Sequence, residues 1–485
     1  MLNFLRAVAV LAKWKGYLWA PHYLRTRLLQ RSRPALGETI DVIVSMVDHF
    51  EPSRREGEQG VEKVRMWCEN YALAADAHRD ADGMRPQHSW FYRYDYPSDD
   101  CLRILSEYVF RGFGEIEFHL HHGHDTPASF AAKLREGVQW FNRAGAMLSA
   151  EPVPQRRFAY IAGNWALDNG RRDDSMSGVN TELAILREAG CYADFTFPAF
   201  GMSSQPRMAN AIYYATDDPA PKSYATGTPV RVGGQAIGDL MIVTGPLYVD
   251  WRRGRIEYAA YEAFAPYTRE RLDYWLRAGV HVAGRPEWIF IKLHTHGMQS
   301  RAAFEPGPLG KLFEDLEAVF NAPPFRLHYV TARETYNIVK AAEGGHRGNP
   351  GQYRDYLIKP PVNRCIGANR PYVVRSYAPE RVAIDIEAGD RDVELRFRTL
   401  PLRAVRGGRI TQLELTHDDS GQQRLDVAGS GDCVVEFTSG SLEAASPSVA
   451  RCRLPASFVA HPSISGGLRW VAGRDAAKAR VAGDG

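Results

Sequence analysis

The chain has 485 residues, which is enough for two or three folded domains. Hydrophobic residues make up 45% and charged residues 24%, a balance typical of globular proteins. Sixty Lys and Arg against 57 Asp and Glu leave a net charge of +3, so we expect no nucleic-acid partner. No uninterrupted apolar run reaches about 18 residues, which predicts that the chain does not span a membrane.

The amino-terminal segment, residues 1–37, is basic and amphipathic. Its first 35 residues hold no acidic side chain, and their basic ones are Arg6, Lys13, Lys15, Arg25, Arg27, Arg31 and Arg33. The apolar stretch is too short and too interrupted for a secretory signal, so we expect a cytoplasmic protein. Two readings stay open. The segment is either a helix in peripheral contact with a membrane through residues 1–35 or a helix packed on the main domain.

The six cysteines are scattered without a Cys-x-x-Cys pair. Neither a zinc knuckle nor a disulfide framework is therefore predicted, and a reducing compartment fits this usage best.

Residues 38–345 alternate short β-branched or aromatic runs with helical patterns, which predicts a β/α layered or barrel domain. The expected strands are 39–47, 88–94, 115–122, 157–163, 194–198, 239–245, 287–294 and 327–330. The expected helices lie near 60–79, 99–111, 127–147, 179–189, 267–278, 309–320 and 331–342.

The carboxyl-terminal part has a different pattern. Glycine and proline in residues 346–370 predict a linker. Short strands with regular turns in residues 371–475 predict a small β-sandwich, and residues 476–485 read as a frayed tail.

Polar clusters follow the predicted strands, at the edge where barrels and open α/β sheets gather their active sites. Asp48 and His49 follow the first strand in VSMVDHFEP. EFHLHHGHDTP packs His119, His121 and His122 into four positions. Because alternate strand residues share a face, His119 and His121 should point together, and with a carboxylate they would suit a divalent metal, zinc above all.

Two further clusters agree with this placement. GNWALDNG presents Asn164, Trp165, Asp168 and Asn169, a mixture of aromatic wall and polar groups typical of small-molecule or carbohydrate recognition. FIKLHTHGM places Lys292, His294 and His296 at alternate positions, and a histidine there is a natural general acid or base.

Structural roles are the competing interpretation of each residue taken singly. Asp125 and Thr126 precede a predicted helix and can cap it, and Trp165 can be a core residue. The sequence has no Gly-x-Ser-x-Gly elbow, phosphate-binding loop or His-Glu-x-x-His helix, which speaks against a serine hydrolase, a nucleotide hydrolase and a metalloprotease.

The order of these motifs over residues 39–345 resembles the polysaccharide deacetylase superfamily. The resemblance implies a distorted (β/α) barrel of that type followed by the small all-β sandwich domain. It further implies a divalent metal held by Asp48, His119 and His121 or His122, with His294 or His296 as the acid. The chain is also similar to a divergent group of deacetylase-like bacterial proteins. This similarity rests on the segments DHFEP, HLHHGHDT, GNWALDNG, CYADFT and KLHTHG.

Two features depart from the superfamily pattern. No second aspartate accompanies Asp48, and no two histidines in HLHHGHDT are four residues apart. Asp168 or Asp125 would then have to replace the missing base.

The sequence thus predicts a metal-dependent hydrolase that removes acetyl groups from a polysaccharide or oligosaccharide. We assign Asp48, His49, His119, His121 and His122 to the metal, and Asp168, His294 and His296 to catalysis. We assign Asn164, Trp165, Asn169 and Lys292 to the substrate. Two alternatives remain: a non-catalytic glycan-binding or assembly protein with a degenerate site, and another metal-dependent carbohydrate hydrolase on the same barrel.

Overall fold

The computed structural model describes residues 12–29, 37–52, 58–143, 149–151, 153–171 and 178–361, and beyond these the strands between Arg364 and Val481. The described residues form two compact units. The first holds residues up to Pro97, Gly114–Gln139 and Gln155–Lys359. The second holds Ser98–Phe113, Trp140–Pro154 and the chain from Pro360 onward.

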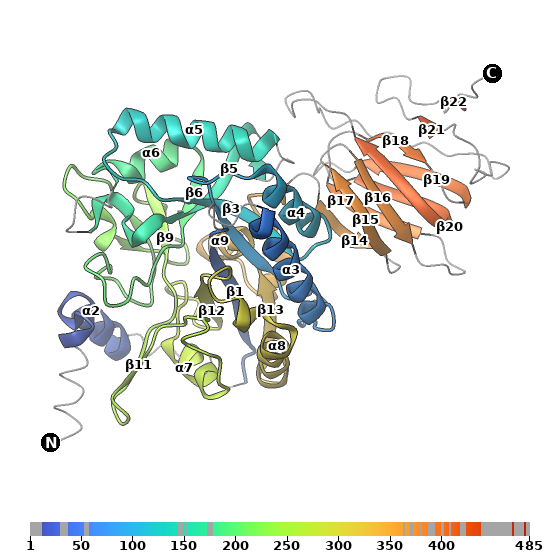
Figure 1. Ribbon diagram of the computed structural model, residues 1–485. Coiled ribbons are helices and arrows are strands. Elements are labelled where there is room, and N and C mark those ends of the chain that lie inside the picture. Colours follow the sequence, from blue (N-terminus) through green and yellow to red (C-terminus); the bar gives the residue numbers. More distant parts are fainter. Residues whose placement is uncertain are drawn as a thin grey trace. The chain divides into compact units, whose positions relative to one another are not determined.

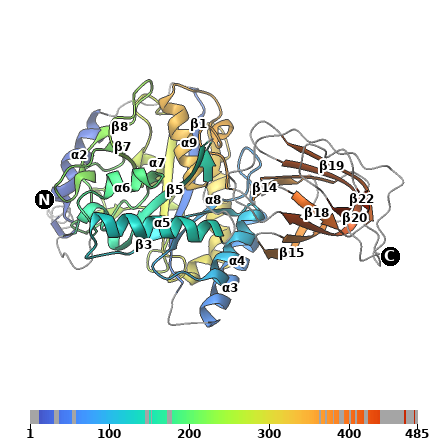
Figure 2. The same cartoon turned by 90° about the horizontal axis from the view of Figure 1, so that it is seen from above.

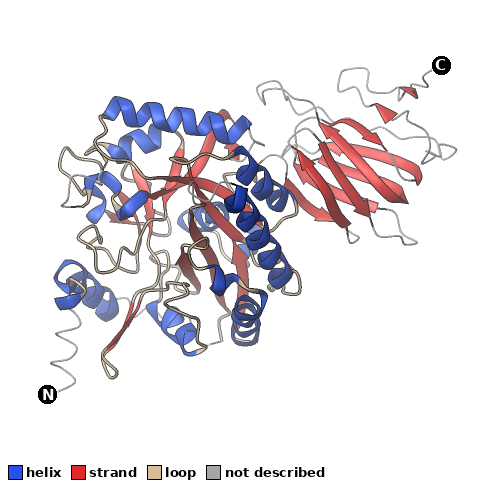
Figure 3. Cartoon of the chain, in the orientation of Figure 1, coloured by secondary structure: helices blue, strands red, loops and turns tan. Residues whose placement is uncertain are grey.

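The first unit is an α/β fold around an eleven-stranded, mostly parallel sheet, as the alternating pattern predicts (Figures 1 and 3). Strands pair in the order β12-β1-β2-β3-β5-β6-β9-β7-β8, with β13 beside β1 and β4 beside β5. The parallel strands are β12 (Trp288–Thr295), β1 (Ile40–Phe50), β2 (His88–Arg93), β3 (Gly114–Leu120), β5 (Val153–Ala162), β6 (Cys191–Asp194), β9 (Leu240–Val243) and β13 (Phe325–Val330). Antiparallel β7 (Ile212–Ala215) and β8 (Thr228–Pro229) complete one edge, and β4 is Ser149–Glu151.

The strand ladder is open, but single hydrogen bonds connect its two sides. Phe290 N on β12 donates to Val280 O at 2.8 Å. Ala283 N donates to Val230 O at 3.0 Å, and Val230 N donates to Ile212 O on β7 at 2.9 Å. The sheet therefore curls around its core although no strand closes it.

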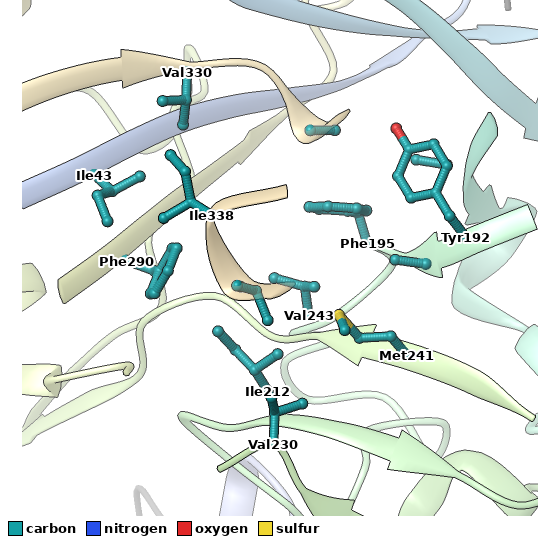
Figure 4. Packing of buried hydrophobic residues seen from close by; sticks show 14 of the residues in the cluster. Ile43, Tyr192, Phe195, Ile212, Val230, Met241, Val243, Phe290, Val330 and Ile338 are labelled. Atoms are coloured by element: carbon teal, nitrogen blue, oxygen red, sulfur yellow. The ribbon is translucent and has the colours of Figure 1, made fainter. Parts of the chain in front are cut away.

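The core lies on the concave side of this sheet. Ile43 and Val47 of β1 and Phe290 of β12 are buried there with Ile338 of the last helix (Figure 4). Because strand residues alternate between faces, the residue two positions beyond Val47 faces the same interior at the carboxyl end of β1. That residue is His49, so the core packing aims this imidazole into the mouth of the curled sheet.

Helices occupy the connections, where the sequence places them. They are α3 (Glu58–Ala75), α5 (Pro127–Arg143), α6 (Glu182–Glu188), α7 (Glu270–Ala278), α8 (Pro306–Phe320) and α9 (Ala332–Glu343). Thr331 and Glu334 form a reciprocal capping box at the start of α9, which fixes where β13 ends and the helix begins. Among the described residues, no helix combines the length and apolar character needed to cross a bilayer.

The strand expected at 194–198 lies earlier, at β6. Phe195 N still bonds to Tyr160 O, but Thr196 N donates to the Asp194 carboxylate at 3.0 Å instead of to a neighbouring strand. The side chain of Asp194 thus ends the ladder.

The amino-terminal segment packs on the first unit as far as it is described. In helix α2 (Gly16–Leu29), Trp19 is fully buried and Tyr23 is almost fully buried. Both side chains pack with Leu247 and Val249. The Tyr23 hydroxyl accepts a hydrogen bond from Val249 N at 3.1 Å. Of the two readings of this segment, packing on the main domain is confirmed for residues 12–29. Residues 1–11 and 30–36 lie outside the described part.

The second unit combines helix α4 (Asp99–Phe110) with antiparallel strands (Figure 2). Its central strand is β20 (Gln423–Phe437), which pairs with β16 (Arg381–Ile386), β17 (Val393–Arg398), β18 (Leu402–Arg406) and β19 (Arg409–His417). The remaining strands are β14 (Arg364–Ala368), β15 (Tyr372–Ala378), β21 (Leu468–Arg469) and β22 (Arg480–Val481). Of the predicted linker, residues up to Lys359 belong to the first unit and Arg364–Ala368 is a strand. The predicted tail falls partly outside the described residues.

Candidate functional site

Three side chains from the ends of β1 and β3, which lie on either side of β2, form the centre of the candidate site. His49 lies on β1, Glu51 follows that strand directly, and His119 lies near the end of β3. One potential ligand atom from each lies within 4.8 Å of the other two. Two imidazoles and one carboxylate are a set of donors that zinc accepts in catalytic sites.

The hydrogen bonds of His119 fix which of its ring nitrogens faces this centre. Its Nδ1 lies 2.8 Å from Ile161 O, and since a carbonyl only accepts, Nδ1 carries the hydrogen. Burial lowers the pKa of His119, so the neutral ring is favoured. Its Nε2 then carries no hydrogen and has a lone pair that can accept. That lone pair lies 3.2 Å from Glu51 Oε1, which is also an acceptor. Two acceptors at this distance are stable only with a cation or a proton between them.

His49 supplies an independent sign of a missing partner. Its Nε2 atom is buried and has no hydrogen-bond partner among the described residues. Burial, reinforced by the histidines around it, lowers the pKa of His49 well below its usual range. A buried neutral imidazole with an unused nitrogen fits a metal ligand, because a metal would satisfy the atom that the protein leaves unpaired.

His121 stands beside this centre. Its Nδ1 lies 3.1 Å from Asp95 Oδ1, and its Nε2 lies 3.6 Å from Glu51 Oε1. Asp95 is in turn bound by Arg93, which also lies 3.5 Å from Glu51 Oε2. Burial works against the charge of Glu51, but the neighbouring histidines, His119 first and then His121 and His296, lower the pKa of Glu51 to about 2. Glu51 is therefore ionised.

His296 covers the other side of the centre. Its ring stacks on His49 with centroids 4.5 Å apart, and its Nδ1 lies 2.8 Å from Glu262 Oε1. Ser300 Oγ donates to the second oxygen of Glu262, so this carboxylate is held at both ends. Burial opposes a charge on His296, but the bond to Glu262 and the surrounding carboxylates outweigh it and raise the pKa of His296.

The candidate site is partly exposed to solvent at His121, His296 and Glu51. The side chains of His121 and His296 are each 23% exposed, and that of Glu51 is 12% exposed. Trp165 borders the opening, with its ring centroid 5.7 Å from that of His49 and 5.5 Å from that of His296. Solvent therefore reaches the edge of the centre, where Trp165 presents an aromatic ring.

The backbone that carries Trp165 is strained. Asn164, Trp165, Asp168 and Asn169 all have positive φ angles, between 49° and 56°. Such conformations cost free energy for residues other than glycine and persist where the surroundings impose them, often at functional sites. Asn164 is partly exposed in the same turn as Trp165.

His294 faces the interior two residues below His296. Its ring lies 5.8 Å from that of Tyr258, and its Nδ1 is buried without a partner among the described residues. Burial, and then the charge of Lys292, lowers the pKa of His294 well below its usual range.

Five other residues assigned from the sequence lie apart from the centre. Asp48 is fully buried on the opposite face of β1, where its oxygens meet His88 Nε2 at 3.0 Å and Gly297 N at 2.7 Å. His122 lies between Asp125 at 3.0 Å and Glu182 at 3.2 Å.

Asp168 and Asn169 turn toward a different part of the chain. Asp168 Oδ2 accepts from Ser223 N at 2.6 Å, and Asn169 Nδ2 donates to Asn180 Oδ1 at 2.9 Å. Lys292 is buried inside the sheet and donates to Phe195 O at 2.5 Å and to Phe197 O. These contacts are structural.

Sequence reasoning left three carboxylates of the site unassigned. Glu51 stands in the first motif but is not among the assigned ligands, and Asp95 and Glu262 lie outside every motif. Asp95 follows the end of β2 by two residues, and an acidic residue just past a parallel strand is the signal that could have found it. Glu262 lies in an irregular segment, so only the tertiary structure reveals it.

Comparison of the sequence with protein-family models and with curated proteins gives no match.

Proposed function

We propose that this protein is a metal-dependent hydrolase that removes acetyl groups from a polysaccharide or oligosaccharide, on a distorted barrel of the polysaccharide deacetylase type. The observation that carries the hydrolase proposal is the convergence of His49, Glu51 and His119. The choice of acetyl groups rests on the order of sequence motifs, and the aromatic border at Trp165 suits a sugar ring. The antiparallel unit would be the β-sandwich that follows such a barrel.

His49 and His119, each through Nε2, and Glu51 would hold a zinc or similar divalent ion. A metal with an open position lowers the pKa of bound water towards about 7 and polarises an acyl carbonyl. Ile161 O would orient His119 from behind, as acceptors commonly do for metal-bound imidazoles, and Asp95 would hold His121 beside Glu51. This ligand set replaces Asp48, which the resemblance implies, by Glu51.

His296 would supply the proton that the leaving group takes up. Water adds its oxygen to the acyl carbon and releases a proton to the solvent, the bond from that carbon to nitrogen or oxygen breaks, and the leaving group takes a proton from His296. Glu262 accepts from Nδ1 of His296, which leaves Nε2 as the nitrogen that would give this proton. The raised pKa of His296 keeps a transferable proton on this ring near neutral pH.

A non-catalytic glycan-binding protein is the second candidate. The observation that favours it is that Asp48, Asp95 and Glu262 each have partners, so none of them stands as an unengaged base. Release of acetate separates the two functions.

The first experiment is elemental mass spectrometry of the purified full-length protein. We expect near-stoichiometric zinc or another divalent metal, lost in Glu51→Gln and in His119→Ala. Asp48→Asn should keep the metal, because Asp48 lies on the other face of β1. Melting curves show whether each variant is folded.

The second experiment measures acetate release from acetylated oligosaccharides by the metal-loaded protein. Acetate release that Glu51→Gln abolishes would support the deacetylase. Bound metal without release of acetate would favour the binding protein, and no metal after reconstitution would refute the metal site.

A further inference from the structure

The exposed side of helix α2 is apolar and flanked by basic residues. Tyr17 is 65% exposed and Leu24 is 44% exposed, and with Pro21 they follow the i, i+4, i+7 spacing of one helix face. Trp19 and Tyr23 occupy the opposite, buried face. The packing of α2 on the first unit therefore leaves a second apolar stripe in solvent.

The charged side chains in and just before this helix are all basic. Lys13 and Arg25 are exposed, and Arg25 and Arg27 lie on either side of the stripe. The described segment 12–29 holds no acidic residue. Among the described residues, Arg25 forms no ion pair, so its charge is available to an anionic partner.

A second basic and aromatic element lies beside the helix. Strands β10 (Tyr248–Asp250) and β11 (Arg255–Glu257) form a two-stranded antiparallel hairpin with the turn Trp-Arg-Arg-Gly. Trp251 is 42% exposed, and Arg252 and Arg255 are exposed without an ion pair among the described residues. Figure 1 shows the hairpin next to α2, with its turn projecting away from the sheet.

Contacts fix these two elements to each other. Tyr23 accepts from Val249 N, and the guanidinium of Arg27 lies 5.2 Å from the ring centroid of Tyr248. Helix and hairpin, more than 200 residues apart in sequence, are thus held against each other. We define the basic-aromatic surface as Lys13, Tyr17, Leu24, Arg25, Trp251, Arg252 and Arg255.

We propose that the basic-aromatic surface docks on an anionic phospholipid bilayer. A lipid surface accepts exposed tryptophan, tyrosine and leucine at its interface without requiring a shaped partner, and its anionic headgroups attract arginine and lysine. The chain that precedes the helix, MLNFLRAVAVL, adds seven apolar residues larger than alanine, one arginine and no acid. This inference concerns a surface outside the candidate site and does not depend on the proposed function.

The test is co-sedimentation of the full-length protein with vesicles. One set contains phosphatidylcholine alone and the other contains phosphatidylcholine with phosphatidylglycerol. We expect binding to the anionic vesicles that high salt weakens, and little binding to the neutral ones. Arg252→Gln with Arg255→Gln should weaken the binding by about 30-fold, from about 1 kcal/mol for each arginine near the surface.

A second variant removes only apolar groups. Tyr17→Ser, Leu24→Ser and Trp251→Ser together should also weaken the binding, because a bilayer takes up these side chains. The matched control is Arg65→Gln with Leu73→Ser on α3, which removes an exposed arginine and an exposed leucine from another helix and should bind as the wild type does. Melting curves confirm that the variants fold.

Two outcomes would overturn the proposal. One is that the protein binds neither kind of vesicle, or binds the neutral and the anionic vesicles equally well. The other is salt-sensitive binding that the serine variant leaves unchanged, since the surface would then attract polyanions in general rather than a bilayer.

Discussion

His121 and Asp95 are joined twice. Asp95 Oδ1 lies 3.1 Å from both the backbone N and the ring Nδ1 of His121. One carboxylate oxygen therefore fixes the backbone and the ring orientation together, and it leaves Nε2 facing Glu51. This is the arrangement by which a second carboxylate commonly orients a histidine next to a metal.

The first prediction concerns this carboxylate. Asp95→Asn should weaken metal affinity by about tenfold, because a neutral amide holds the imidazole less firmly and makes it less basic. Competition with a coloured chelator measures the change. Glu62→Gln, which removes a 73% exposed carboxylate from α3, is the control and should bind metal normally. Unchanged affinity in Asp95→Asn would remove Asp95 from the site.

Gly163 is a second support of His121. A Cβ atom added at Gly163 would lie 2.5 Å from the Cα of His121 and 2.6 Å from its ring. Gly163→Ala should therefore displace His121 and lower the free energy of unfolding by about 1 to 3 kcal/mol. Denaturant titration measures the change.

The matched change for this prediction is Gly310→Ala in α8. Nothing lies within 4 Å of its added Cβ, so the better helix propensity of alanine should raise the free energy of unfolding by about 0.5 to 1 kcal/mol. A stable Gly163→Ala protein would show that the backbone at His121 can move freely.

Asp168 should make stability depend on pH. Burial, with repulsion from Glu182 and Asp217, raises the pKa of Asp168 to about 8 although Ser223 bonds to it. The unfolded value is about 3.9, so the folded protein holds the proton more tightly. The stability contributed by this proton is complete at low pH and is lost as the pH rises through about 8.

Asp168→Asn removes this titration. Its free energy of unfolding relative to the wild type should rise by roughly 1 to 3 kcal/mol between about pH 5 and pH 9. Denaturant titrations of both proteins at the two pH values measure the difference. A constant difference would mean that Asp168 is ionised throughout.

Trp19 should be essential for the packing of α2. Its ring is fully buried, lies 5.7 Å from that of Tyr23, and donates from Nε1 to Trp14 O at 3.2 Å. Trp19→Ala should lower the free energy of unfolding by about 3 to 5 kcal/mol. Tyr17→Ala on the exposed face should change it by less than about 0.5 kcal/mol. Equal effects would mean that the helix is not held by its buried face.

Most strands and helices of the first unit could be predicted from the sequence. The run IDVIVSMV carries apolar residues on both faces, as buried parallel strands do, and the structure places β1 between β12 and β2. The prediction at 194–198 was wrong in position, because the polar Asp194 ends β6 through a side-chain bond that periodicity does not reveal. The hairpin β10–β11 was missed because each of its strands is only three residues long.

Within the site, spacing predicted which residues share a strand end but not which atoms converge. His119 and His121 were expected together, and their rings lie 4.5 Å apart. His122 was assigned to the metal as well, although strand alternation turns it away from His119 and His121, and it forms its own pair of bonds with Asp125 and Glu182.

The sequence by itself determined the α/β architecture and the strand ends that carry the polar residues, because hydrophobic periodicity and strand alternation are local properties of the chain. Strand alternation already places Glu51 rather than Asp48 on the face of His49, but the tertiary structure alone decided that this face is the interior, because the core contacts of Val47 fix it. It also decided that Asp95 and Glu262 stand behind the histidines. Their distances depend on how separate strands and loops meet, and no local pattern encodes such contacts.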